Sequence, residues 1–164
     1  MFLEASLIRK ALISVDNVYR YSLGRRWANG EELLWVMLNP STADATAEDA
    51  TTRRCISFSN HWGFGAIVIV NLFGFRSTDP KRLTSILDPV GPENDSVLLD
   101  HFKRSESCMV AWGSLVGTRL FQSRVKEIYR HLPNKTRCLG LTKYNYPRHP
   151  LRVSSVTKPS AYVM

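Results

Sequence analysis

The sequence predicts one α/β domain over residues 1–164: a three-layer α/β/α sandwich with four parallel core strands and one N-terminal antiparallel edge strand. Two observations support this fold class. Short apolar runs alternate along the chain with segments of helical periodicity, an order typical of parallel sheets that helices cover on both faces. The run AIVIVNL at 66–72 is apolar and mostly β-branched up to its Asn, as expected for a central strand that is buried on both faces.

The N-terminal part of the chain is expected to contribute two strands and a helix. Segments 19–27 and 32–38 flank Asn29-Gly30, a dipeptide typical of tight hairpin turns, so they are expected to pair as antiparallel strands. A loop rich in Ala, Thr and Asp follows. Helical spacing of apolar residues then predicts a helix over about 49–62.

The rest of the chain repeats the order of strand and helix and ends in a basic, loop-like tail. The most regular helical pattern lies at 117–132, where apolar residues share one face and basic residues lie outside it. In chain order, the expected elements are a strand at 66–72, a short helix within 77–87, a helix within 91–104, a strand at 107–113, the helix at 117–132 and a strand at 136–141.

The composition is that of a basic globular protein, with 44% hydrophobic and 22% charged residues. The formal net charge of +8 favours a polyanionic partner such as nucleic acid, although many basic proteins bind none. No apolar run reaches membrane-spanning length, and the first residues do not form a clear signal peptide. We therefore expect a cytoplasmic location and no membrane partner.

The cysteine and histidine residues do not form a metal-binding pattern. Cys55, Cys108 and Cys138 are far apart in the sequence and form no CxxC pair, which predicts buried free thiols. The four histidines are scattered, without the spacing of metal ligands. We expect neither a metal ion nor another cofactor.

Polar residues follow each of the four predicted parallel strands. In open α/β sheets, ligands bind beyond the carboxyl ends of the strands, so these residues are expected to meet at one site. They are Asn39-Pro40-Ser41-Thr42 after the first strand, Asn71 and then Arg76 after the second, Gly113-Ser114 after the third, and Thr142-Lys143 with Pro147-Arg148-His149-Pro150 after the fourth.

Each of these residues also has a purely structural interpretation. Asn39 before Pro40 is typical of a turn. Asn71 is equally compatible with a buried amide that bonds a loop, and His149 with a residue that holds the tail in place. The convergence of several segments, with two asparagines at matching strand ends, favours the site.

The loop after Asn39 carries acidic residues with two interpretations. Asp44, Glu48 and Asp49 precede the predicted helix, so capping of its N-terminus is the simpler role, and a general base is the alternative. Gly113-Ser114 enters a predicted helix and could offer backbone N–H groups to a phosphate.

Several segments in order resemble one protein family. The combination of MLNPSTADA, DATTRRC, WGFGAIVIVNLFGFRSTDP, VGPEND, AWG and CLGLTKYNYPRHPL is similar to the DUF1643 family of bacterial and phage proteins. The resemblance covers about residues 19–152. The family name itself implies no activity.

A more distant similarity, to the uracil-DNA glycosylase superfamily, implies a function. Its mismatch-specific and thymine-type branches carry a Gly-Ile-Asn-Pro-Gly-like motif after the first parallel strand, and MLNPS is similar without the flanking glycines. The superfamily often has a base-reading Asn at the end of the next strand, which Asn71 matches. RHPLRVSS is similar to its His-Pro-Ser-Pro-Leu-like loop without the Ser-Pro insertion.

The second resemblance implies a DNA glycosylase that flips a uracil, mismatched or modified base from DNA and hydrolyses its N-glycosidic bond. Asn39 would hold the attacking water, with help from Asp44 or Asp49, and His149 would donate to the base oxygen. The base would contact Pro40, Asn71, Phe73 and Phe75, whereas Ser41, Arg76, Gly113, Ser114, Lys143, Arg148, Leu151 (as a wedge) and Arg152 would bind DNA and its phosphates.

The expected partner is single- or double-stranded DNA, and no obligate protein partner is predicted. Two alternatives remain open on the sequence. One is a non-catalytic module that binds nucleic acid or nucleotides. The other is an enzyme that acts on free nucleosides or nucleotides.

Overall fold

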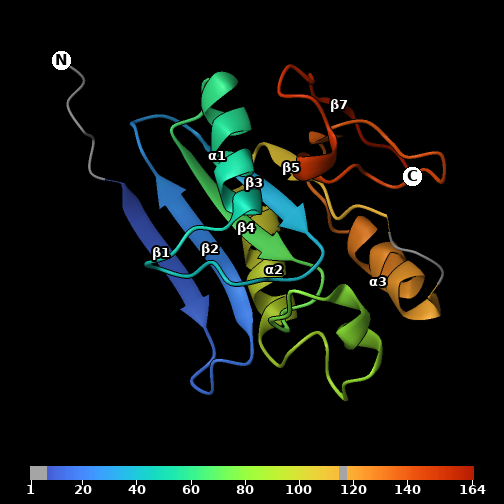
Figure 1. The fold of residues 1–164 in the computed structure, drawn as a ribbon. Coiled ribbons are helices and arrows are strands. Elements are labelled where there is room, and N and C mark those ends of the chain that lie inside the picture. The colour runs from blue at the N-terminus through green and yellow to red at the C-terminus, as the bar shows by residue number, and fades with distance from the viewer. Residues whose placement is uncertain (1–6, 115–117) are drawn as a thin grey trace.

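The computed structural model describes residues 7–114 and 118–164, which form one mixed sheet and three α-helices (Figure 1). The predicted α/β class is confirmed. The strands are β1 (Ile8–Ile13), β2 (Arg20–Arg26), β3 (Glu32–Met37), β4 (Ala66–Asn71), β5 (Cys108–Val110), β6 (Thr136–Cys138) and β7 (Ser160–Ala161), and the helices are α1 (Ala50–His61), α2 (Asn94–Arg104) and α3 (Arg119–Tyr129), with short 3₁₀ helices η1 (Pro80–Thr84) and η2 (Pro150–Arg152).

The seven strands lie in the order β1-β2-β4-β3-β5-β6-β7. Parallel pairing joins β4 to β3, β3 to β5 and β5 to β6. The pairs β1–β2, β2–β4 and β6–β7 are antiparallel. The carboxyl ends of β3, β4, β5 and β6 therefore lie along one edge of the sheet, where their following loops can meet.

The predicted pairing of the first hairpin is wrong, because β4 lies between β2 and β3. The chain does turn at Gly30, which has a φ of 131°. However, Gly65, just before β4, lies between the two arms of that turn and hydrogen-bonds to both. The carbonyl of Gly65 accepts hydrogen bonds from Trp27 N and Ala28 N at 3.0 and 3.1 Å. A Cβ on Gly65 would lie 2.6 Å from the Ala28 and Asn29 carbonyl oxygens, so only glycine fits there.

The sheet also has more antiparallel strands than the sequence predicts. β1 pairs with the outer side of β2, and the two-residue β7 pairs with β6 in the tail that the sequence presents as a loop. β1 is largely exposed, so it lacks the apolar pattern that identifies a buried strand.

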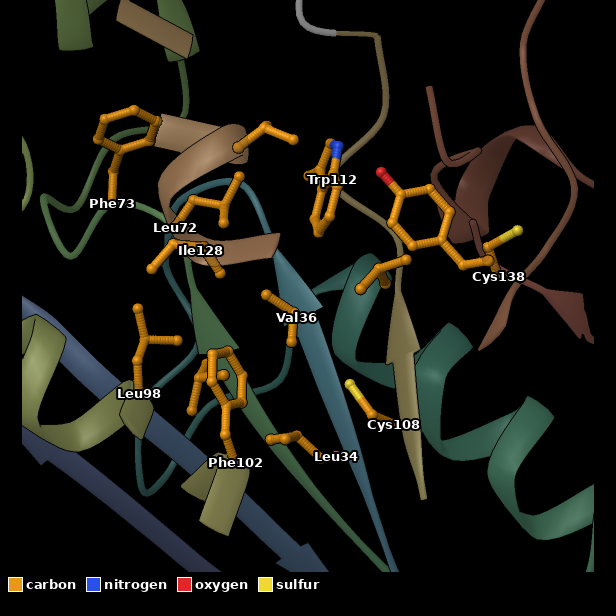
Figure 2. Packing of buried hydrophobic residues seen from close by; sticks show 14 of the residues in the cluster. Leu34, Val36, Leu72, Phe73, Leu98, Phe102, Cys108, Trp112, Ile128 and Cys138 are labelled. Carbon is orange, nitrogen blue, oxygen red and sulfur yellow. The ribbon is translucent and has the colours of Figure 1, made fainter. Parts of the chain in front are cut away.

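Apolar residues fill both faces of the sheet, which explains the continuous apolar runs of β3 and β4. Leu33, Trp35 and Met37 of β3 pack with α1 on one face. Leu34 and Val36 point to the other face, where side chains of α2 and α3 meet them. Figure 1 shows α1 in front of the sheet and α2 behind it. Figure 2 shows from close by the cluster that contains Leu34 and Val36.

The three cysteines are buried and free, as predicted. Burial raises the pKa of the Cys108 thiol to about 12 and also raises the pKa of Cys55. The thiols of Cys55 and Cys108 are therefore protonated at pH 7. In the part of the chain that the structure describes, no helix is long and apolar enough to cross a membrane.

Candidate functional site

A pocket of about 520 Å³ lies beyond the carboxyl ends of β3, β4 and β5. The loops after these strands form its walls, together with the first turn of α1 and the segment that leads into η2. The predicted convergence is therefore present. Of the residues predicted for the site, the pocket is lined by Asn39, Ser41, Asp49, Asn71, Gly113, Ser114, Thr142, Arg148, His149 and Arg152.

Asn71 ends β4, and its side-chain amide is buried in the wall of the pocket, with 1% exposure. Neither Oδ1 nor Nδ2 has a hydrogen-bond partner among the described residues. The backbone carbonyl of Asn71, by contrast, accepts a hydrogen bond from Asn94 Nδ2 at 3.0 Å. A buried amide without partners costs about 1–3 kcal/mol, so this side chain is suited to a ligand with an adjacent donor and acceptor.

Asn39 supports the pocket loop and also faces the pocket. Its Nδ2 donates to the carbonyl oxygens of Ser77 at 2.9 Å and Pro40 at 3.2 Å. These bonds join the loop after β3 to the loop after β4 and fix the orientation of the amide. No donor among the described residues bonds Oδ1, so this oxygen can accept a hydrogen bond from a ligand or water.

His149 lines the pocket just before η2. Its Nδ1 accepts a hydrogen bond from the backbone N–H of Leu151 at 3.2 Å, so the neutral ring carries its proton on Nε2. Burial, reinforced by the charge of Arg152, lowers the pKa of His149, and the charge of Asp49 opposes this shift in part. His149 is therefore a neutral imidazole at pH 7, with Nε2–H as a donor.

Gly113 allows the loops around His149 to approach closely. Its φ is +78°, and a Cβ there would lie 3.4 Å from the Cβ of His149. The N–H of Gly113 donates to the carbonyl oxygen of Pro147 at 2.9 Å, which joins the loop after β5 to the loop that carries the histidine. This N–H is therefore already used within the protein and does not serve a phosphate in this structure.

Two acidic residues of the loop after β3 differ in position. Asp49 caps α1, as its sequence position suggests, because its Oδ1 accepts from Thr52 N at 2.7 Å, and it also lines the pocket. Asp44 lies outside the pocket, where its Oδ1 accepts from the backbone N–H groups of Thr46 and Ala47. These bonds lower the pKa of Asp44 to about 2, so this carboxylate structures the loop and is a poor base.

The two phenylalanines predicted to stack on a base lie away from the pocket. Phe73 is fully buried in the core, where its ring centroid lies 5.5 Å from that of Phe121. Phe75 packs edge-on against Tyr19, and the guanidinium of Arg82 lies over its ring. Directly after Asn71 the chain leaves the pocket, and the carbonyl oxygen of Leu72 accepts a hydrogen bond from Arg124 Nε of α3 at 2.8 Å.

The remaining predicted residues lie around the pocket rather than in it. Pro40 is buried beside it, and Lys143 is exposed. Leu151 is 48% exposed in η2, next to His149. Arg76 lines an adjoining groove, which shares Ser41 with the pocket.

Arg54 of α1 holds the histidine loop in place. Its Nε and Nη2 donate to the carbonyl oxygens of Pro150 at 3.3 Å and Val153 at 2.8 Å. In the loop after β3, Arg25 of β2 donates to Glu48 at 2.6 Å and also to the carbonyl oxygen of Asp44. Arginine side chains therefore fix two of the loops that shape the pocket.

Sequence reasoning missed Arg20 of β2, which is 3% exposed and lines the pocket. Along β1 and β2 the register shifts, so that one step from Leu12 to Ile13 matches two steps from Ser22 to Arg20. Such a bulge reverses the alternation of side chains along a strand. The bulge therefore brings Arg20 to the α1 face of the sheet, where Leu23 also packs. Under strict alternation, Arg20 and Leu23 would lie on opposite faces.

Hydroxyl groups form a further part of the wall that the sequence did not predict. Thr51 and Thr52 come from α1, and Ser77 and Thr78 from the loop after β4. Ser77 and Thr78 stand just before η1, a position that equally indicates capping, whereas Thr51 and Thr52 lie within α1 after its N-cap Asp49 and have no distinctive signal in the sequence. Hydroxyls beside arginines and amides suit a ligand rich in oxygen atoms.

The fold and site define an α/β protein with a pocket beyond the carboxyl ends of its parallel strands, lined by amide, hydroxyl and arginine side chains together with apolar ones such as Trp112. The chain belongs to the DUF1643 family, described as proteins of unknown function, whose model matches residues 20–151. The matched range contains every residue that lines the pocket except Arg152. No curated protein and no solved structure matches the chain.

Proposed function

We propose that the protein is a DNA glycosylase-like enzyme that accepts a flipped nucleotide and hydrolyses the N-glycosidic bond of its base. The observation that carries this proposal is that Asn39, Asn71 and His149, from three separate segments, line one pocket. The Asn71 amide offers an unpaired donor and acceptor, the combination that reads a base edge. A volume of about 520 Å³ is in the range of small-molecule sites and can hold a nucleoside.

The proposal assigns a role to each of three polar groups. Asn39 Oδ1 orients a water molecule, and Asp49 of the same pocket accepts its proton. The neutral His149 donates its Nε2–H to the base oxygen on which negative charge develops as the bond breaks. The sugar becomes oxocarbenium-like, so water placement and charge stabilisation matter more than a strong nucleophile.

The strand arrangement agrees with a uracil-DNA glycosylase-like fold. β4, β3, β5 and β6 pair in parallel, and of the two asparagines Asn71 ends β4 while Asn39 follows the neighbouring β3. Leu151 is exposed beside His149, in a position from which an apolar side chain can enter the gap left by a flipped base. Phe73 has no part in this proposal, because it is a core residue.

A second candidate is an enzyme or binding module for free nucleotides. The specific observation in its favour is that arginine and hydroxyl side chains lie inside the pocket itself, where Arg20 is buried. A polymeric substrate would place its phosphates mainly at the mouth. Activity on small substrates without preference for polymer would favour this candidate.

The test is to incubate the protein with single strands and duplexes that contain uracil, mismatched thymine, or hydroxymethylated or glycosylated pyrimidines. Abasic sites are then quantified. Release of at least one base is expected, with losses of about 10²–10³-fold on His149→Ala, the cost typical of one lost oxyanion donor. Asn39→Ala should also lower the rate.

Two variants serve as matched controls, because His131 and Asn134 are exposed and do not line the pocket. His131→Ala and Asn134→Ala should retain full activity. Binding of DNA without any abasic product would refute the glycosylase proposal and favour a binding module. Activity that survives both Asn39→Ala and His149→Ala would show that the site is misassigned.

A further inference from the structure

Three arginines are buried in the described part of the chain, and only one of them lacks an ion pair there. Arg25, 1% exposed, bonds Glu48 at 2.6 Å, and Arg124, 4% exposed, pairs with Asp95 and Glu127. Arg20, 3% exposed, forms no ion pair with any described carboxylate. The protein therefore balances the charge of two buried guanidinium groups and leaves the third unbalanced.

The hydrogen bonds of Arg20 do not compensate its charge. Nη1 donates to the carbonyl oxygen of Ala43 at 2.7 Å, which is a neutral acceptor. Nε is buried and has no partner among the described residues. Burial lowers the pKa of Arg20 to about 10, and the charge of Asp49 offsets only part of this effect, while Arg76 and Arg25 add to the shift. A buried, charged donor without an acceptor is costly unless a ligand supplies one.

The pocket around Arg20 carries excess positive charge. Among the described residues, three arginines line it, Arg20, Arg148 and Arg152, against the one carboxylate of Asp49. His149 is neutral at pH 7 because burial lowers its pKa. Hydroxyl side chains such as Thr52 and Ser77 stand along the same wall and can share the oxygens of an anion.

We propose that Arg20 binds an oxyanion inside the pocket, so that the ligand carries a phosphate or a carboxylate at this point. This inference deepens the proposed function, because it concerns the same pocket and defines the chemical class of its substrate. The oxyanion has two possible sources. One is the phosphate of a nucleotide that enters the pocket, and the other is an acidic substituent on the flipped base.

The experiment compares ligands that differ only in the oxyanion. Isothermal titration of the 164-residue protein at low salt compares deoxyuridine 5′-monophosphate with deoxyuridine, and 5-carboxyuracil with uracil. Inorganic phosphate is a third probe. The anionic member of at least one pair should bind about tenfold or more tightly, since a hydrogen bond to a charged group contributes roughly 1.5–3 kcal/mol.

Variants then assign the preference to Arg20. Arg20→Gln removes the charge and should abolish the preference, and Arg20→Lys keeps a charge and should retain part of it. Arg119→Gln removes an exposed arginine outside the pocket and controls for net charge. Circular dichroism and urea unfolding show whether each variant is folded.

The outcomes separate this inference from the glycosylase proposal, because binding is measured without bond cleavage. An anion preference that Arg20→Gln removes supports the inference even if no DNA base is ever released. Equal affinity of the wild-type protein for both members of both pairs, together with no phosphate binding, overturns it, and this comparison needs no variant. A preference that persists in folded Arg20→Gln also overturns it.

Discussion

At the scale of single residues, the pocket combines groups that the protein leaves unpaired with groups that it holds firmly. Asn71 and Arg20 are buried with polar atoms that have no partner among the described residues, whereas Asn39 and Asp49 are anchored by backbone groups. The unpaired groups cost stability in the free protein. That cost is recovered when a ligand supplies the missing partners.

Asn71 provides a direct test of this trade between stability and binding. Asn71→Leu replaces two unpaired buried polar atoms by apolar ones, so the free energy of unfolding should stay the same or rise by up to about 1 kcal/mol. Ligand binding or base release should be lost. Urea unfolding measures the change in the free energy of unfolding. A loss of more than about 2 kcal/mol would contradict the view that the amide is unpaired.

His149 predicts a pH dependence of stability. Its pKa is lowered in the folded protein, so as the pH falls below about 6.5 the unfolded chain takes up a proton before the folded chain does. The free energy of unfolding should therefore fall with pH across this window and level off below the folded pKa. Urea titrations at pH 7.5 and 5.5 should show a smaller loss for His149→Gln than for the wild-type protein.

His101 is a second histidine whose pKa is lowered, mainly by burial. Comparison of His149→Gln with the wild-type protein leaves the contribution of His101 in both, so the difference isolates His149. An identical pH dependence in the two proteins would show that His149 titrates as an exposed histidine does.

At the scale of elements, buried arginines connect the strands to the loops that form the pocket. Arg25 of β2 reaches Glu48 and the carbonyl oxygens of Asp44 and Ala47 in the loop after β3. Arg54 of α1 reaches the loop of His149. The pocket walls are therefore attached to the most regular parts of the fold.

Glu48→Gln tests the attachment through Arg25. The change removes the charge partner of a buried guanidinium, so the free energy of unfolding should drop by about 2–3 kcal/mol, less than for a fully buried pair because Glu48 is partly exposed. Amide hydrogen exchange should speed up in residues 43–49. Asp100→Asn, which breaks an exposed ion pair with Arg104, is the control and should have little effect.

Gly65 tests the insertion of β4 between β2 and β3. Gly65→Ala should lower the free energy of unfolding by about 1–3 kcal/mol or more, because its Cβ would meet two backbone carbonyls at 2.6 Å. Gly24→Ala is the matched control, since its Cβ would meet only the side chain of Lys10 at 3.6 Å. Thermal unfolding should separate the two variants clearly. Equal stability would mean that the 28–30 turn can move aside.

At the scale of the whole molecule, the sequence predicts the class of fold and the edge of the sheet at which the pocket lies. β3 after Glu32 and β4 up to Asn71 are recognisable because they are continuously apolar. Asn39, just beyond the end of β3, and Asn71, the last residue of β4, then meet in the pocket. Features that depend on distant parts of the chain were not predictable. These are the partner of β2, the bulge that directs Arg20, and the turn of Phe73 into the core.

The net charge of +8 leads to a prediction for DNA binding. If Arg148 and Arg152 contact phosphates, the double variant Arg148→Gln/Arg152→Gln should reduce the slope of log affinity against log salt by about 2, close to 0.9 per contact. Fluorescence anisotropy with a labelled oligonucleotide over a salt series measures the slope. An unchanged slope would place the phosphates elsewhere on the protein.

The position of β4 also has a consequence for how the chain reaches its native state. β2 and β3 are joined by a short Asn-Gly turn and can pair early as a local hairpin, as such turns favour. In the finished sheet, β4 separates them, so any early hairpin must open before β4 enters. During synthesis, β4 emerges after both of these strands. A premature β2–β3 hairpin is therefore expected to act as a kinetic trap, and the opening of this hairpin should limit the refolding rate.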